Sequence, residues 1–102
     1  MKEYRLIANS DFTPKMWIYL EDAIKRHPDF AKTPHQAICI ITEELGELCQ
    51  AINDGNTKLA RVELFHCIAT LTRLYGMYLE YDALVNNAEK LLKGEKCTSK
   101  QD

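Results

Sequence analysis

The sequence is poor in the residues that interrupt helices, with only four glycines and three prolines in 102 residues. Segments that alternate apolar and polar residues, as half-buried strands do, are nearly absent as well. Apolar residues recur instead at intervals of three and four, which is typical of amphipathic helices. No internal repeat, low-complexity tract or linker divides the chain. The sequence therefore predicts a single all-α domain over residues 1–102, a bundle of about four helices.

An excess of basic residues is also missing, since 13 Lys and Arg stand against 15 Asp and Glu. This balance argues against nucleic-acid binding and gives no attraction to an anionic membrane surface. The apolar runs are far shorter than a bilayer span, and the N-terminus lacks the apolar segment of a signal peptide. The four cysteines form no CxxC pair, which disfavours a disulfide framework or a cysteine zinc site. These absences predict a cytoplasmic protein with reduced thiols.

Capping residues predict where the first two helices begin and end. A threonine-proline pair starts a helix over residues 14–26, which stops before the next proline. The same pair recurs at Thr33, now with Gln36 placed to complete a capping box, and starts a helix over residues 34–53. Gly55 is suited to close this second helix.

The second half of the chain is predicted to hold two further helices. One covers about residues 57–78, and the other begins near Asp82 as its N-cap and ends at Gly94. Residues 1–12 and 95–102 are predicted to be irregular. A chain of this length buries only about two-thirds of its unfolded surface, so the bundle is expected to complete its core by self-association.

Acidic side chains fall on the apolar faces of the two central helices, where an ionised group is costly. Glu44 projects into the apolar stripe of the first of these helices, and Glu47 lies at its border. Glu63 points along the stripe of the second, with His66 three positions later. Because a short turn makes these helices antiparallel neighbours, the four side chains are expected to meet across the contact.

Two interpretations of these side chains follow. Three carboxylates and an imidazole can coordinate a divalent cation, and facing helices of a bundle often supply such ligands. Alternatively, Glu47 belongs to an ordinary solvated face, Glu63 pairs with a cation such as Arg73, and His66 is a hydrogen-bonded core residue. The position of Glu44 and Glu63 within the apolar stripes supports the first interpretation, but the spacing alone leaves both open.

The motif EELGE at residues 43–47, followed after fifteen residues by ELFH at residues 63–66, resembles the signature of the MazG-like nucleoside triphosphate pyrophosphohydrolases. That all-α superfamily carries EExxE and then ExxD, and the resemblance covers residues 34–78. It implies hydrolysis of a (d)NTP between its α and β phosphates to (d)NMP and pyrophosphate, as a house-cleaning activity. It also implies a MazG-like bundle assembled as a homodimer or homotetramer.

The resemblance implies a role for each residue of the two motifs. Glu44, Glu47 and Glu63 would be metal ligands, and His66 would take the place of the family's aspartate. Glu43 would be the catalytic residue that orients or deprotonates the attacking water.

Substrate contacts are expected from residues outside the motifs. Arg73, on the His66 side of its helix, and Lys90 are candidates to contact the phosphates. Asn87 is a candidate for the sugar or the phosphates. Trp17 can stack on the base, although its spacing from its apolar neighbours is equally typical of a core residue.

His66 is where the sequence departs from the family pattern. Histidine in place of aspartate removes a negative charge and an oxygen ligand, and Mg²⁺ prefers oxygen whereas imidazole suits Mn²⁺ better. Three outcomes follow: an enzyme that works with Mn²⁺, an enzyme that holds Mg²⁺ with the three glutamates alone, or a protein without turnover. The last would be a nucleotide-binding or oligomeric interaction module.

Overall fold

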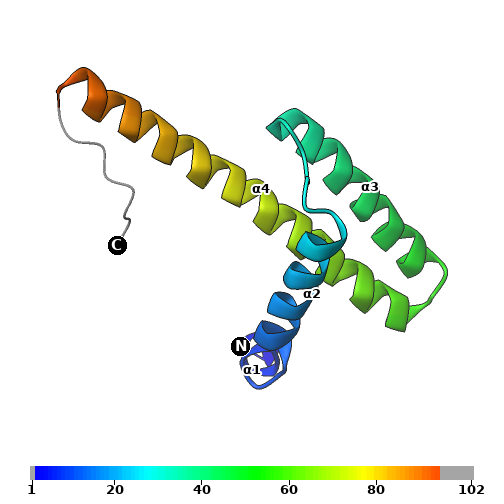
Figure 1. Ribbon diagram of the computed structural model, residues 1–102. Helices are drawn as coiled ribbons and strands as arrows, with labels where there is room; N and C mark the ends of the chain where they lie inside the picture. The colour runs from blue at the N-terminus through cyan, green and yellow to red at the C-terminus, as the bar shows by residue number, and fades with distance from the viewer. Residues whose placement is uncertain (1, 95–102) are drawn as a thin grey trace.

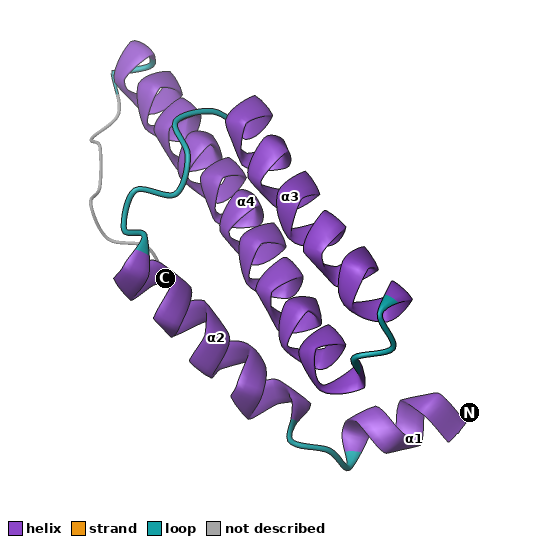
Figure 2. Cartoon of the chain, turned by 90° about the vertical axis from the view of Figure 1, so that its right-hand side faces the viewer, coloured by secondary structure: helices purple, strands orange, loops and turns teal. Residues whose placement is uncertain are grey.

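The computed structural model describes residues 2–94, and within this range the chain forms four α-helices and no strand (Figure 1). The helices are α1 (Lys2–Ala8), α2 (Phe12–Arg26), α3 (Pro34–Asn53) and α4 (Thr57–Leu92). α3 and α4 lie antiparallel and side by side, and α2 packs against α4 (Figure 2). The predicted all-α fold of about four helices is confirmed. The segment 95–102, predicted to be irregular, lies outside the described residues.

α3 begins and ends where its capping residues predict. Thr33 Oγ1 accepts the backbone N–H of Gln36 at 3.1 Å, and Gln36 Oε1 accepts the backbone N–H of Lys32 at 2.7 Å. Gly55 has a φ of 69°, which a residue without a side chain adopts most easily. Asn56 then caps α4 by accepting a backbone N–H of its first turn at 3.0 Å. This tight turn makes α3 and α4 antiparallel neighbours.

The first two helices begin earlier than predicted. Residues 2–8 form the short helix α1, where an irregular segment was expected. α2 begins at Phe12 with Asp11 at its N-cap, so Thr13 lies inside the first turn. Lys15 pairs with Asp11 at 3.2 Å across this turn, an i,i+4 contact that supports the earlier start.

α4 is one continuous helix of 36 residues, and the predicted break before Asp82 is wrong. The stretch from Tyr78 to Asp82 contains neither Gly nor Pro, and an aspartate alone does not stop a helix that has already formed. Because α3 has only 20 residues, the C-terminal half of α4 projects beyond the other helices (Figure 1). Residues 71–92 include no buried side chain.

The core is small and lies between α3 and α4. Its apolar members are Ala37, Ile41, Leu48, Ala51, Cys67 and Ala69. Twenty large apolar side chains of the described chain are exposed. Within residues 2–94 no helix combines the length and the apolar character needed to cross a bilayer.

Arg73 fastens the end of α2 to α4. Its Nη1 donates to Ala23 O at 3.2 Å, and its Nη2 donates to His27 O at 2.7 Å and to Pro28 O at 3.4 Å. The guanidinium also lies 4.8 Å from the centre of the Phe30 ring. The last carbonyls of a helix have no donor within the helix and attract positive charge. Arg73 therefore caps α2 from another helix.

Replacing Arg73 with methionine should lower the free energy of unfolding by about 2 kcal/mol, because its charged hydrogen bonds to the carbonyls at the end of α2 are lost. Urea unfolding followed by circular dichroism measures this change. Arg61→Met is the matched control, since Arg61 is exposed on the same helix and should change stability by less than about 0.5 kcal/mol. Equal stability of the two variants would contradict the capping role of Arg73.

Candidate metal centre

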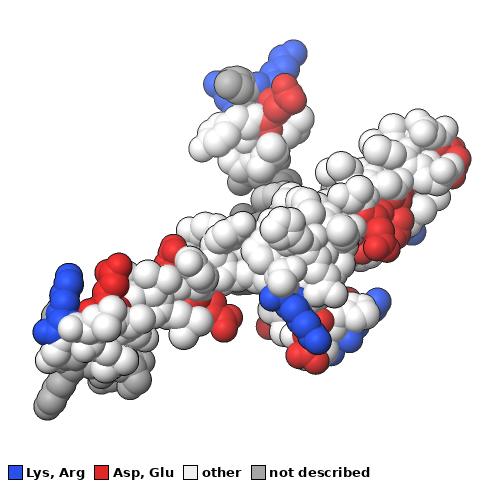
Figure 3. Space-filling model, turned by 90° about the horizontal axis from the view of Figure 1, so that it is seen from above, with Lys and Arg blue, Asp and Glu red and all other residues white. Residues whose placement is uncertain are grey.

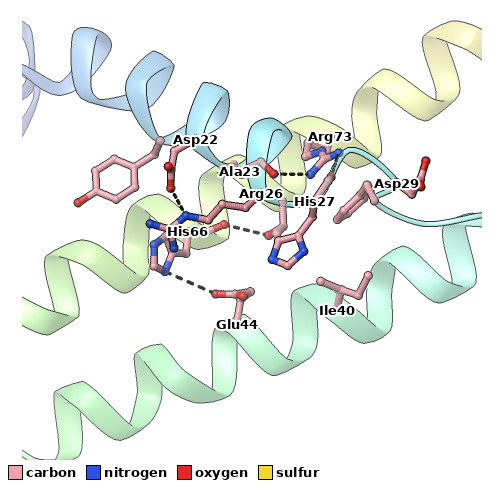
Figure 4. A pocket seen from close by; sticks show the side chains of 13 residues that line it. Asp22, Ala23, Arg26, His27, Asp29, Ile40, Glu44, His66 and Arg73 are labelled. Atoms are coloured by element: carbon pink, nitrogen blue, oxygen red, sulfur yellow. Dashed lines mark hydrogen bonds and ion pairs between the residues drawn. The ribbon is translucent and has the colours of Figure 1, made fainter.

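α3 and α4 bring Glu44, Glu63 and His66 together, in a group whose ligand atoms all lie within 4.8 Å of one another. His66 Nδ1 is 3.4 Å from Glu63 Oε1 and 3.8 Å from Glu44 Oε2. Glu63 and His66 share one face of α4 because they are three positions apart. Figure 4 shows Glu44 reaching from α3 toward His66 on α4. The predicted meeting of these side chains across the helix pair is present in the structure.

The two carboxylates are buried without full hydrogen bonding. Glu63 is 6% exposed, and the side chain of Glu44 is 24% exposed. Glu44 Oε2 and Glu63 Oε2 are shielded from solvent and accept no hydrogen bond. A buried acceptor without a partner costs about 1–3 kcal/mol. A divalent cation would satisfy both atoms at once, and two carboxylates with one imidazole are a suitable donor set for it.

Glu47 lies beside this group rather than within it. Glu47 is exposed on α3, but its carboxyl is close enough to Glu63 for the two to affect each other's titration. Desolvation and the negative charge of Glu63 raise the pKa of the Glu47 carboxyl. Glu47 therefore lies near Glu63, at the exposed edge of the group.

Burial is also the main cause that raises the pKa of Glu44, and the charge of Glu47 raises it further. The charge of His66 acts in the opposite direction. Cys67 lies next to the same carboxylates, and burial followed by the charge of Glu44 raises the pKa of its thiol. The thiol therefore stays protonated, as expected for a structural cysteine.

A cavity of about 360 Å³ opens beside the three side chains (Figure 4). Glu44 and His66 line it from α3 and α4, and the last two turns of α2 form another wall. Tyr19 of α2 packs edge-on against the imidazole of His66, with ring centres 5.6 Å apart, and stacks on Phe65 at 5.1 Å. α2 therefore positions His66 and closes one side of the cavity.

The sequence interpretation missed this wall of α2. Tyr19, Asp22, Arg26 and His27 all line the cavity. Their spacing of three or four positions places the first three on one face of the helix, which is the signal that was present in the sequence. This spacing did not lead to a prediction, because a helix face with polar residues is typical of a solvent-exposed surface.

The residues predicted to bind substrate do not all reach this cavity. Arg73 lines it, but its guanidinium is bonded to the carbonyls of α2 and does not pair with Glu63. Trp17 is 56% exposed and is not part of the lining, so it is not a core residue of the single chain either. Asn87 and Lys90 lie about four turns or more beyond Arg73 along α4. A single chain does not bring these two to the site.

The catalytic residue implied by the resemblance, Glu43, is exposed on α3 next to Glu44. Its charge contributes to the raised pKa values of Glu44 and Glu47, so it lies near the ligand group without being part of it.

Comparison with protein-family models, curated proteins and solved structures gives no match to this chain. The MazG-like assignment rests on the motifs at residues 43–47 and 63–66 and stays a prediction.

Glu44→Gln should stabilise the metal-free protein by about 1 kcal/mol at pH 7, because a buried charge is removed, and should change little at pH 4. The pKa of Glu44 is raised above its ordinary value of 4.5 in the folded state. The folded protein therefore binds more protons than the unfolded chain just above that value, and stability falls as the pH rises through this range.

Urea unfolding with a chelator present, at pH 4 and pH 7, measures this difference. Glu21→Gln is the control, since Glu21 is exposed on α2 and does not line the cavity. A Glu44→Gln protein less stable than the wild type at pH 7 would show that the Glu44 carboxylate is already well paired without metal.

Proposed function

We propose that this protein is a metal-dependent nucleoside triphosphate pyrophosphohydrolase of the house-cleaning type. Its reaction would convert a (d)NTP into a (d)NMP and pyrophosphate. The observation that supports the proposal is the grouping of Glu44, Glu63 and His66 beside a cavity between three helices, which Glu44 and His66 line. Phosphoryl transfer depends mainly on positioning and charge stabilisation, so a small helical domain can supply the groups it needs. A cytoplasmic location belongs to the same proposal.

In the proposed reaction, the ligand group would bind the metal and Glu43 would act on the attacking water. Glu44, Glu63 and His66 would hold the cation, with Glu47 on its solvent side. A bound divalent cation would neutralise phosphate charge and lower the pKa of a water molecule. Glu43 would orient the attacking water and accept its proton, while the bond between the α phosphorus and the bridging oxygen breaks and pyrophosphate leaves.

His66 determines which metal fits. Mg²⁺ is the expected cofactor where carboxylates dominate the ligand set, because it requires oxygen ligands in octahedral geometry. The imidazole makes Mn²⁺ the better match for the group that the three side chains form. The proposed enzyme therefore uses Mg²⁺ or Mn²⁺, with Mn²⁺ favoured as long as His66 is a ligand.

One observation favours a second candidate function. His66 Nδ1 lies 3.4 Å from Glu63 Oε1, so a protonated His66 can offset part of the negative charge without any metal. A site neutralised in this way would have lost turnover. The protein would then be a catalytically degenerate relative that serves as a nucleotide-binding or oligomeric interaction module.

Pyrophosphate release from a panel of NTPs and dNTPs, with Mg²⁺ and with Mn²⁺, separates the two candidates. Glu63→Gln should reduce release by more than about 100-fold, because it removes a central ligand. His66→Asp should shift the metal preference toward Mg²⁺. Glu80→Gln, exposed on α4 far from the site, should keep wild-type activity. No release from folded wild-type protein with either metal would favour the degenerate module.

We also propose that the working unit is a homodimer or homotetramer. The chain has an accessible surface of 8545 Å², whereas a folded monomer of its mass exposes about 5900 Å². The excess, about 2600 Å², is comparable to the area that one subunit buries in a large obligate homodimer interface. Much of the visible surface carries no charged side chain (Figure 3). A second copy is the partner that would cover this surface.

The unpaired half of α4 is the main surface for this assembly. Between residues 71 and 92, apolar side chains recur at alternating intervals of three and four, as they do in helices that pack along their length. Several of them are more than half exposed, among them Tyr81, Leu84 and Leu91. A helix segment with few tertiary contacts is marginal in water, so pairing with a second copy would stabilise it.

The double variant Tyr81→Glu with Leu84→Glu should therefore dissociate into monomers with a lower melting temperature. Light scattering at micromolar concentration should find the wild type as a dimer or tetramer. Asn86→Glu is the control, since residue 86 lies on the opposite side of the helix from this stripe. A monomeric wild type would contradict the assembly, and so would a double variant that keeps the wild-type mass.

A further inference from the structure

The proposed substrate places strong negative charge in a cavity that is already acidic. Glu44 lines the cavity, Glu63 belongs to the same group of ligand atoms, and Glu47 is close enough for its charge to raise the pKa of Glu44. One divalent cation does not balance these carboxylates and a triphosphate together. Positive charge supplied by the protein would therefore stabilise the triphosphate, because fixed cationic groups offset charge that develops in the reaction.

The cavity offers few cationic side chains for this purpose. Apart from His66, those in its lining are Arg26, His27 and Arg73. Arg73 is occupied by three backbone carbonyls of the α2 end. An imidazole is only partly charged near neutral pH, whereas a guanidinium is always charged and binds phosphate through two N–H groups at once. Arg26 is therefore the best-suited cation.

Arg26 is held in the free protein by a partner that it can leave. Its Nε lies 3.0 Å from Asp22 Oδ2, one turn earlier on α2, and the two side chains are 71% and 48% exposed. An exposed pair of this kind contributes little free energy. Figure 4 shows the pair on the α2 wall of the cavity, across from Glu44 on α3. Arg26 can thus exchange one carboxylate for a phosphate without a large cost.

We propose that Arg26 is a phosphate-binding residue of this cavity and that Asp22 holds it in place until an anionic ligand enters. The inference rests on the proposed function, because a triphosphate is the ligand concerned. If one phosphate group of the ligand is bound near Glu44 and His66, its other phosphate groups lie in the same cavity, beside the wall that contains Arg26. Arg73 then keeps this wall in position by capping α2.

The chain contains a matched pair for comparison. Lys15 of α2 and Asp11, the N-cap of this helix, have the same i,i+4 spacing, with Nζ 3.2 Å from Oδ2. Both side chains are exposed, and neither lines the cavity. Variants of this pair change the charge of α2 by the same amount as variants of Arg26 and Asp22, but away from the proposed site.

The test is isothermal titration calorimetry of the full chain with α,β-methylene-ATP, which cannot be cleaved between the α and β phosphates, and with inorganic tripolyphosphate. Both titrations are run with Mn²⁺ present. Arg26→Gln should weaken binding of both ligands by about tenfold or more. Asp22→Asn should strengthen binding by about twofold, because the competing carboxylate is removed. Lys15→Gln and Asp11→Asn should bind as the wild type does.

The outcomes separate the role of Arg26 from the function itself. If Arg26→Gln binds like the wild type while Glu63→Gln does not bind, the role of Arg26 is overturned and the proposed function stands. If the folded wild type binds neither ligand, both are overturned. Weaker binding of the nucleotide analogue but not of tripolyphosphate would show that Arg26 contacts the nucleoside, which also overturns the inference. Tighter binding by Asp22→Asn supports the inference if it disappears in the double variant with Arg26→Gln. If the gain persists without Arg26, it comes from the lost charge of Asp22 alone, and the holding role of Asp22 is overturned.

Discussion

Glu44 and Glu63 bring their carboxylates into the contact between α3 and α4, and the other parts of the site are arranged around that contact. The apolar residues at the contact are mostly small, among them Ala37, Ala51 and Ala69. Small residues let two helices approach closely, and close approach is what brings the ligand atoms of Glu44, Glu63 and His66 within 4.8 Å of one another. The same choice leaves little apolar burial to stabilise the single chain. The small residues that let the acidic side chains meet therefore also lower the stability of the single chain.

α2 contributes position rather than burial. It has no buried residue of its own, and it is held at its C-terminal end by the side chain of Arg73. Its face nonetheless supplies the aromatic ring that packs against His66 and one wall of the cavity. Few residues of α2 are constrained by packing, so those on its cavity side are free to be residue types that contact a ligand.

The sequence was sufficient for the features that depend on local chemistry. The ends of α3 follow from Thr33 and Gly55, and the meeting of Glu44 with Glu63 and His66 follows from helical spacing and a short turn. The continuity of α4 was missed because Asp82 is a good N-cap residue, and an N-cap residue inside a helix looks the same in sequence as one at its start. The role of Arg73 was missed because it depends on where α2 ends in space.

The cavity lining was missed for a related reason. Helical periodicity identifies the apolar face of α2, but the face that matters for the site carries Asp22 and Arg26. Such residues become part of a site only when another helix lies opposite them. That arrangement is set by contacts between residues about 50 positions apart, such as Arg73 with Ala23, and no local pattern contains this information.

The length of α4 has a further consequence. At 36 residues the helix spans about 54 Å, with the acidic group in its N-terminal third and the unpaired apolar stripe toward its other end. The ligand group and the exposed apolar stripe lie on the same helix but have no side chain in common. Natural variation in one half can accumulate without affecting the other, so related chains could change how they assemble while keeping the same chemistry. The length of α4 would also set the distance between the cavities of two subunits that assemble through this stripe.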